Sequence, residues 1–125
     1  MTRYHILIVD DEKRYANMLA KRLNLRGCAC EVCYNGKEAL EILDRKKFFL
    51  ILLDLRLPDI YGIEVLTRIK ESGVKIPVII LTAHGTEEDR QECMRQGAYA
   101  FMHKPLRIEA LMTILARIKR GALND

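Results

Sequence analysis

The chain has 125 residues, of which 50% are hydrophobic and 30% are charged. This length suits one compact domain with a single core and leaves no room for a second. No apolar run approaches the roughly 20 residues that a membrane-spanning helix needs, and the N-terminus lacks the long apolar stretch of a secretory signal. We therefore expect one cytoplasmic domain with no membrane partner.

The charged residues give a formal net charge of +4 at pH 7. Binding to nucleic acid would require the basic residues to gather on one segment or face. Here they are scattered among acidic residues along the chain. We expect no direct contact with nucleic acid by this segment.

The four cysteines are Cys28, Cys30, Cys33 and Cys93. The first three fall inside a stretch with the composition of a strand. A zinc site would need a second Cys-x-x-Cys pair or a nearby histidine to complete its ligands, and the sequence has neither. We therefore expect buried free thiols.

Strand-like and helix-like segments alternate along the chain. Five apolar runs have the length of strands, at residues 4–9, 28–34, 48–53, 78–82 and 99–102. Segments with helical periodicity separate these runs, and one more follows the last. The sequence predicts a strand followed by a helix, five times over.

The helices have recognisable boundaries and apolar faces. The first covers about residues 12–25, and the second begins at Asn35, a good N-cap with Glu38 three residues later. The third covers about residues 62–72, and the last follows Pro105. The side chains expected to face the core are Ala16, Leu19, Ala20, Leu23, Ala39, Leu40, Leu43, Leu66, Ile69, Ile108, Leu111, Leu115 and Ile118.

The fourth helix, at about residues 86–96, differs from the others. Thr86 and Asp89 form a good capping pair at its start. Its body is mostly charged or amide side chains, with Cys93 and Met94 almost alone as apolar residues. Such limited burial predicts a marginal, mobile helix.

The strands at residues 6–9, 49–53 and 78–81 are continuously apolar, as expected when helices cover both faces of a parallel sheet. The predicted fold is α/β, a doubly wound five-stranded parallel sheet with strand order 2-1-3-4-5, which is flavodoxin-like (βα)5. In such a sheet a site forms at the switch point, where the carboxyl ends of strands one and three lie side by side.

Carboxylates follow two of these strands directly. Asp10, Asp11 and Glu12 come after the first strand, and Asp54 comes after the third. Each like-charged pair about 4 Å apart would cost on the order of 4 kcal/mol at an effective dielectric near 20, so a cation must offset the repulsion. Mg²⁺ prefers such oxygen ligands and leaves positions for a phosphate. The alternative is that Asp10 and Asp11 only cap the first helix and complement its dipole.

Two further residues reach the same edge from the other side. Thr82 ends the fourth strand and Lys104 follows the fifth. Each alone is an ordinary strand or surface residue. Together with the acids they place a hydroxyl and an ammonium group at one edge of the sheet, an arrangement suited to phosphoryl chemistry.

The stretches that carry a further signal are ILIVDDE at residues 6–12, LDLRLPDIYG at 53–62, LTA at 81–83, Gly97-Ala98, Phe101 and Lys104-Pro105. Together and in register, they resemble the receiver domains of two-component response regulators. The resemblance spans essentially the whole chain. It implies a receiver domain at residues 1–125, with a core at about 4–120 and a tail or the start of a linker at 121–125.

The resemblance implies roles for the site residues. Asp54 is implied as the phosphoacceptor, Asp11 as a direct Mg²⁺ ligand, Asp10 as a support for the metal through water, and the backbone carbonyl of Arg56 as a further ligand. No general base is needed, because a carboxylate such as Asp54 is already ionised near pH 7.

The resemblance also implies how the signal leaves the site. Thr82 and Lys104 are implied to hold phosphoryl oxygens, Phe101 to be the switch aromatic in place of the frequent tyrosine, and the Lys104-Pro105 bond to be cis. Arg56 and His84 are implied to tune hydrolysis of the phosphoryl group.

The implied phosphoryl donor is a sensor histidine kinase or a phosphotransfer protein. The chain would then be a signalling domain that assists its own phosphorylation and loses the phosphoryl group slowly, not an enzyme proper. The implied output surface is formed by the fourth helix, fifth strand and fifth helix, which control an effector domain or a homodimer.

Two other functions are compatible with such a fold but fit these residues less well. A Mg²⁺-dependent phosphatase with an aspartyl intermediate needs a second acid two residues after the nucleophile, where this chain has Arg56. A flavin- or nucleotide-binding module needs a glycine-rich phosphate loop after the first strand, where Asp10, Asp11 and Glu12 would repel an anion.

Overall fold

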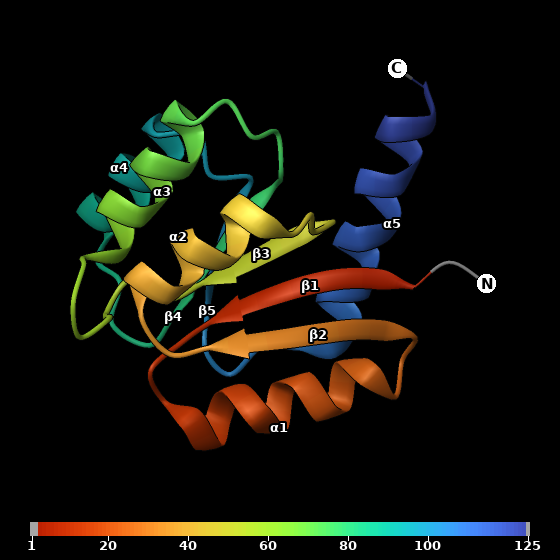
Figure 1. The fold of residues 1–125 in the computed structure, drawn as a ribbon. Helices are drawn as coiled ribbons and strands as arrows, with labels where there is room; N and C mark the ends of the chain where they lie inside the picture. Colours follow the sequence, from red (N-terminus) through yellow and green to blue (C-terminus); the bar gives the residue numbers. More distant parts are fainter. Residues whose placement is uncertain (1–2, 125) are drawn as a thin grey trace.

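The computed structural model describes residues 3–124, and the side chains of residues 3–121. Five strands alternate with five helices along this part of the chain, as predicted (Figure 1). The strands are β1 (Tyr4–Val9), β2 (Cys28–Cys33), β3 (Leu50–Leu53), β4 (Val78–Thr82) and β5 (Ala100–His103). The helices are α1 (Lys13–Asn24), α2 (Gly36–Arg45), α3 (Gly62–Glu71), α4 (Glu87–Arg95) and α5 (Ile108–Asn124).

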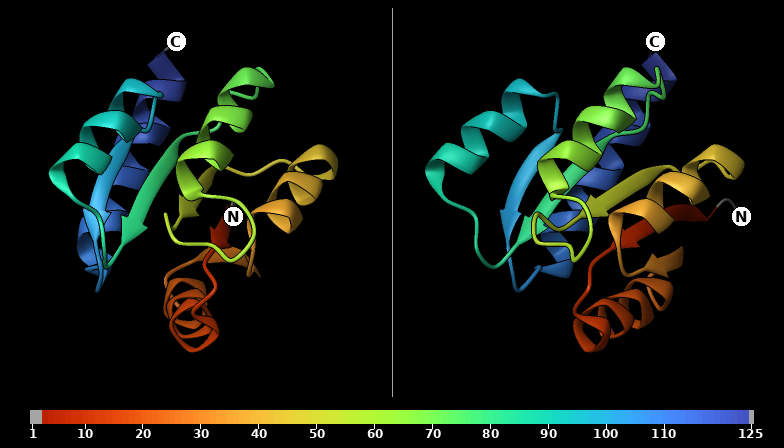
Figure 2. Two further views of the ribbon diagram at one scale, coloured as in Figure 1. Left: turned by 90° about the vertical axis from the view of Figure 1, so that its left-hand side faces the viewer. Right: turned by 60° about the vertical axis from the view of Figure 1, so that its left-hand side comes forward.

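The strands form one parallel sheet in the order β2-β1-β3-β4-β5, which confirms the predicted topology. The right-hand view of Figure 2 shows this order, from blue β5 through green β4 and the central strands to orange β2. Because β1 and β3 are neighbours although α1, β2 and α2 separate them in sequence, the switch point lies between them.

Helices cover both faces of the sheet, with α2, α3 and α4 on one side and α1 and α5 on the other (Figures 1 and 2). Side chains of successive strand residues alternate between the two layers. One layer receives Leu7, Val9, Ile51, Leu53, Val78 and Ile80. The other receives Ile6, Ile8, Leu50, Leu52, Ile79 and Leu81. The strands are continuously apolar because both of their faces are buried.

Helix α2 begins as predicted, since the Asn35 side chain accepts a hydrogen bond from the Glu38 backbone N–H at 2.8 Å. Its buried face differs from the prediction. Ala39 is buried, but the next buried side chain is Ile42, whereas the expected core residues Leu40 and Leu43 are only half-buried. The helix therefore directs residues three apart toward the sheet and leaves its leucines at the sides of that contact.

Helix α4 has the predicted cap and the predicted limited burial. Thr86 and Asp89 exchange side-chain and backbone hydrogen bonds in a complete capping box. Cys93 is the helix's buried residue, and Met94 is 39% exposed. The helix thus contributes a single side chain to the core, and its mobility remains a prediction.

The remaining expectations concern the cysteines and the chain end. All four cysteines are free, with Cys28, Cys33 and Cys93 buried and Cys30 half-buried. Helix α5 continues through Asn124, so residues 121–124 of the expected tail are helical, and residue 125 lies outside the described part. No helix in the described part is long and apolar enough to cross a membrane.

Candidate functional site

Three charged residues lie one position beyond the ends of three strands. Their backbone N–H groups extend the hydrogen bonding of the sheet by one step. The Asp10 N–H donates to the Cys33 carbonyl at 3.0 Å, the Asp54 N–H to Val9 at 3.0 Å, and the Lys104 N–H to Thr82 at 3.1 Å. The sheet therefore fixes the backbone of each residue, and the parallel direction of the strands brings all three to one edge.

The Lys104 ammonium group joins the carboxylates of this edge. Its Nζ lies 2.7 Å from Asp10 Oδ2, 2.9 Å from Asp54 Oδ2 and 2.6 Å from Glu12 Oε1. The Lys104 side chain is 7% exposed, and those of Asp10 and Asp54 are similarly buried. The sequence required a cation to offset the repulsion between carboxylates, and Lys104 provides one positive charge at the centre of the group.

Burial shapes the ionisation of this cluster. It raises the pKa of Asp10 to about 6, because the loss of hydration outweighs the hydrogen bonds from Lys104 and from the Glu12 backbone. Burial by itself opposes the charged form of Lys104, but hydrogen bonds to Asp10, Glu12 and Asp54 raise the pKa of the lysine overall. The lysine therefore stays charged, while burial makes the Asp10 carboxylate easier to protonate.

The same carboxylates fit a hard metal ion. Oxygen atoms of Asp10, Glu12 and Asp54 lie within 4.8 Å of one another. Carboxylate oxygens are the ligands that Mg²⁺ prefers, so this donor set suits the ion. Asp11, expected from the resemblance to be a direct ligand, is exposed and lies outside this group, and its role remains a prediction.

The helix-capping alternative for the acids is not supported. Helix α1 has Glu12 as its N-cap, with no side-chain hydrogen bond to its first turn. Among the described residues, Asp10 Oδ1 accepts a hydrogen bond from the Glu12 backbone N–H alone, at 3.0 Å. The buried Asp10 carboxylate is thus directed at Lys104.

The loop after Asp54 folds back tightly on the end of β3. Its first turn is closed by the Arg56 N–H, which donates to Asp54 Oδ1 at 3.3 Å, while the Arg56 residue is exposed. The Gly62 N–H donates to the Leu55 carbonyl at 2.8 Å. A Cβ at Gly62 would lie 2.5 Å from both the Asp54 carbonyl oxygen and the Leu55 Cα. Only glycine therefore allows α3 to start this close to the candidate phosphoacceptor.

Asp59, in the same loop, caps a different helix. Its carboxylate accepts the backbone N–H groups of Gly36 at 2.8 Å and Lys37 at 2.9 Å, at the start of α2. Slight burial opposes ionisation, but these N–H groups and that of Ile60 lower the pKa of Asp59. The contact ties the loop beside Asp54 to α2. Sequence reasoning missed it, because no local pattern relates residues more than 20 positions apart.

Thr82 and Phe101 meet at the loop that leads into α4. Thr82 is fully buried, and its Oγ1 accepts the His84 N–H at 3.3 Å, while the His84 side chain is exposed. The Phe101 ring packs against Gly85, where a Cβ would lie 2.9 Å from Phe101 Cε1 and 2.9 Å from the Thr82 methyl carbon. The expected switch residues therefore share one contact around Gly85.

The structure confirms that the Lys104-Pro105 peptide bond is cis.

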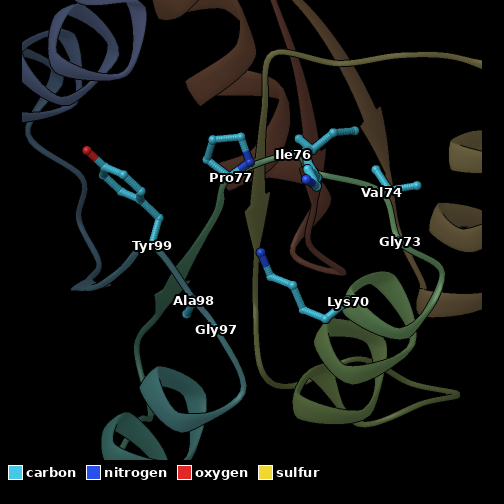
Figure 3. Close-up of a pocket in the computed structure, with 9 residues that line it drawn as sticks. Lys70, Gly73, Val74, Ile76, Pro77, Gly97, Ala98 and Tyr99 are labelled. Carbon is cyan, nitrogen blue, oxygen red and sulfur yellow. The ribbon is translucent and has the colours of Figure 1, made fainter. Parts of the chain in front are cut away.

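A separate hollow lies at the other end of the sheet, between the α3–β4 and α4–β5 loops (Figure 3). It is lined by Lys70, Gly73, Val74, Lys75, Ile76, Pro77, Gly97, Ala98 and Tyr99. These residues include no carboxylate, so the hollow has no part in the acidic site at the carboxyl edge.

A doubly wound sheet with carboxylates and a buried lysine at its switch point is the arrangement that the sequence predicted for a receiver domain. The chain belongs to the response regulator receiver domain family, whose model matches residues 6–116. It is therefore a signalling domain of a two-component response regulator, and the rival phosphatase and flavin-binding functions are not favoured.

Curated relatives agree with this assignment. The chain is 38% identical over 125 residues to the uncharacterized transcriptional regulatory protein YkoG of Bacillus subtilis, covering 100% of this chain and 53% of the relative. It is 36% identical over 115 residues to the transcriptional regulatory protein TrcR of Mycobacterium tuberculosis, covering 92% of this chain and 45% of the relative. The chain thus spans about half the length of these relatives.

Solved structures share the fold over the whole domain. The signal receiver domain of a LuxO repressor-like protein from Vibrio parahaemolyticus matches with a TM-score of 0.89 and 32% identity, covering 99% of this chain and 96% of that one. The BeF3-activated receiver domain of DrrB matches with a TM-score of 0.79 and 30% identity, covering 95% and 97%. The fold and the family predicted from the sequence are confirmed.

Proposed function

We propose that Asp54 accepts a phosphoryl group from the phosphohistidine of a sensor histidine kinase or phosphotransfer protein. The observation that carries the proposal is the joint contact of Lys104 with Asp10 and Asp54, at 2.7 and 2.9 Å. The lysine already occupies the position from which it can bind an oxygen of a group attached to Asp54. A buried ammonium group needs carboxylate partners in any case, and here one of those partners is the proposed phosphoacceptor itself.

In the proposed step a carboxylate oxygen of Asp54 attacks phosphorus. The new P–O bond forms as the P–N bond of the phosphohistidine breaks, and its electron pair remains on the imidazole nitrogen. Positioning and neutralisation of charge are the main requirements of such a transfer. Asp54 is held for attack by the backbone bond to Val9 and by the Arg56 N–H.

Lys104 and Thr82 would bind the transferred oxygens. The Lys104 ammonium group exchanges part of its carboxylate contacts for a phosphoryl oxygen. Thr82, whose hydroxyl oxygen accepts the His84 N–H, turns to donate its O–H to another phosphoryl oxygen. Mg²⁺, when bound, adds positive charge next to the phosphoryl oxygens. Asp10, Asp11, Asp54 and the backbone carbonyl of Arg56 would hold this ion, and the position of Glu12 within the carboxylate group adds a further candidate ligand.

The proposed output is the surface of α4, β5 and α5. Phe101 connects this surface to Thr82 through the contact at Gly85. The relatives extend well beyond the length of this chain, which is in keeping with control of an effector domain, or of a homodimer, through this surface. Arg56 and His84 are exposed and follow Asp54 and Thr82 by two positions, and they would tune a slow loss of the phosphoryl group.

Phosphorylation in vitro tests the assignment. The protein is incubated with acetyl phosphate and Mg²⁺, and its mass is measured intact. We expect one added phosphoryl group in the wild type and none in Asp54→Asn. Asp11→Asn is the informative companion. Although Asp11 is exposed, the proposal makes it a metal ligand, so this variant should need a higher Mg²⁺ concentration for half-maximal labelling.

Two results would contradict the proposal. Equal labelling of Asp54→Asn would show that another residue accepts the phosphoryl group. Labelling of the wild type at the same rate in EDTA would show that no metal ion takes part.

A further inference from the structure

Tyr15, in the first turn of α1, makes two contacts with the segment that carries Lys104. Lys104 Nζ lies over its ring, 4.8 Å from the ring centroid. The Tyr15 hydroxyl oxygen accepts the backbone N–H of Leu106 at 2.9 Å. One half-buried side chain thus holds both the ammonium group of the site and the loop that follows it.

We propose that Tyr15 is a positioning residue for phosphoryl transfer, which holds Lys104 where it can bind the phosphoryl oxygens. The inference rests on the proposed function of Asp54. It assigns the effect to two separable parts of one side chain, the ring and the hydroxyl group.

The ring supplies a face that the carboxylates do not. Lys104 has three N–H donors, and the ammonium group contacts three carboxylates, those of Asp10, Glu12 and Asp54. The aromatic face attracts the cation without using a donor. When Lys104 exchanges a carboxylate for a phosphoryl oxygen, its contact with the Tyr15 ring can persist. The ammonium group then stays near the site while its hydrogen-bond partners change. Without the ring, the flexible side chain would have more positions from which it cannot reach the phosphoryl group.

The hydroxyl group fixes the loop. Leu106 is 8% exposed, and its N–H group would lose its partner if Tyr15 lacked an oxygen. An unpaired buried donor is costly, so the loop would shift to find water. Because Lys104 lies two residues before Leu106, that shift would reach the lysine through the backbone.

The chain offers a matched control at Tyr34. Lys13 Nζ lies over the Tyr34 ring, 5.0 Å from its centroid, and the Tyr34 hydroxyl group hydrogen-bonds to Asn17. Tyr34 thus makes the same two kinds of contact as Tyr15, one lysine over its ring and one hydrogen bond at its hydroxyl group. Its lysine, Lys13, is not part of the site. Replacing Tyr34 therefore removes a similar ring and hydroxyl group without touching Lys104.

The experiment compares Tyr15→Leu, Tyr15→Phe and Tyr34→Leu with the wild type. Labelling by acetyl phosphate with saturating Mg²⁺ is followed at several donor concentrations, at a temperature where every variant is folded. We expect Tyr15→Leu to lower the maximal rate about tenfold, in line with loss of a desolvated cation–π contact. Tyr15→Phe keeps the ring and should lower the rate only about twofold, and Tyr34→Leu should match the wild type.

Two further readouts separate positioning from general damage. The Mg²⁺ concentration that gives half of the maximal thermal stabilisation should be unchanged in Tyr15→Leu, because the ring is not a metal ligand. Hydrogen exchange at the Leu106 amide should be faster in both Tyr15 variants and unchanged in Tyr34→Leu. Both readouts can be measured without the phosphoryl donor.

The proposal is overturned if Tyr15→Leu is labelled at the wild-type rate, or if Tyr34→Leu is slowed equally. A Tyr15→Phe protein as slow as Tyr15→Leu would overturn the role of the ring. Asp54→Asn is measured in parallel, so the two proposals fail in different ways. Labelling of Asp54→Asn contradicts the phosphoacceptor, whereas an unlabelled Asp54→Asn beside unaffected Tyr15 variants contradicts only the role of Tyr15.

Discussion

The carboxyl group of Asp10 binds its proton more tightly in the folded protein than in the unfolded chain. Its pKa is about 6 in the structure, against an ordinary value of 3.8. A raised pKa in an acid means that ionisation costs folding free energy. The cost is absent below about pH 4, grows between pH 4 and 6, where the unfolded chain has lost this proton and the folded protein still holds it, and is fully present above about pH 6.

Asp10→Asn should therefore raise the melting temperature in EDTA at pH 8. The amide stays neutral, and Lys104 keeps its contacts with Glu12 and Asp54. We expect a gain of several degrees, since each kcal/mol shifts the melting temperature of a domain of this size by about 4 °C. The difference between variant and wild type should shrink toward zero as the pH falls from 8 to 4.

The exposed neighbour provides the control for this measurement. Asp11→Asn removes the same charge one residue away, at a side chain that makes no ion pair among the described residues. Its melting temperature in EDTA should stay near that of the wild type. A lower melting temperature for Asp10→Asn at pH 8 would mean that the ion pair with Lys104 outweighs the cost of burial.

Gly85 is the second residue whose replacement gives a clear outcome. A methyl group there would overlap the Phe101 ring and press on the Thr82 methyl group. Gly85→Ala should destabilise the fold by about 1–3 kcal/mol, as expected for overpacking, and should move the ring. In a double-mutant cycle measured by denaturant unfolding, Phe101→Ala should relieve most of this loss. Additive effects of the two substitutions would show that Gly85 and Phe101 are not in contact.

At the level of the elements, the β3–α3 connection is the most constrained. Gly62→Ala would place a methyl group against backbone atoms of Asp54 and Leu55, which cannot turn aside as a side chain can. We expect a loss of about 3 kcal/mol, at the upper end of the range for overpacking, together with slower labelling of Asp54.

Gly121, in α5, is the matched control for Gly62. Beyond its own helix backbone and chain neighbours, a Cβ there meets no atom of the described residues within 4 Å, so Gly121→Ala should stabilise the helix by about 0.5–1 kcal/mol. Chemical denaturation of both variants measures the contrast. If Gly62→Ala were as stable as the wild type, the loop after Asp54 would be able to move away from α3.

The sequence predicted those features of the elements that depend on neighbouring residues. The caps at Asn35 and Thr86 and the limited burial of α4 follow from local patterns, and the structure confirms them. The cap that Asp59 provides for α2 depends on a contact between distant segments. The burial of Ile42 in place of Leu40 and Leu43 depends on how α2 rests on the sheet. Helical periodicity alone does not determine either feature.

The whole molecule should respond to phosphorylation on one side. Beryllofluoride with Mg²⁺, which stands in for the phosphoryl group, should alter hydrogen exchange mainly in residues 82–102 and at the start of α5. Helix α4 should follow the change because Cys93 is its buried residue, and a differential interaction of a few kcal/mol is enough to shift such an equilibrium. Residues 37–47 should change little.

Two observations would argue against this route through the molecule. One is a change in protection that falls chiefly in α2, to which Asp59 ties the loop beside Asp54. The other is an unaltered response in Phe101→Ala.

The candidate site was predictable to the extent that strand ends define it. Asp10, Asp54, Thr82 and Lys104 could be placed at one edge because they end or follow strands of a parallel sheet. The contact of Glu12 with Lys104 was not predicted, since it depends on how the start of α1 turns. Tyr15 was not predicted either, because its partners lie about 90 residues further along the chain.

The residues that meet at Lys104 are far apart in sequence, so the site can form only in a completely folded domain. The site exists only when the ends of β1, β3 and β5 are all in place, since Asp10, Asp54 and Lys104 come from these three strand ends. Any group that binds there binds the folded state alone and stabilises the entire domain by mass action. A chain that is truncated before β5, or in which one of these strands is out of place, would not assemble the site, so under the proposed function we expect only completely folded molecules to be phosphorylated.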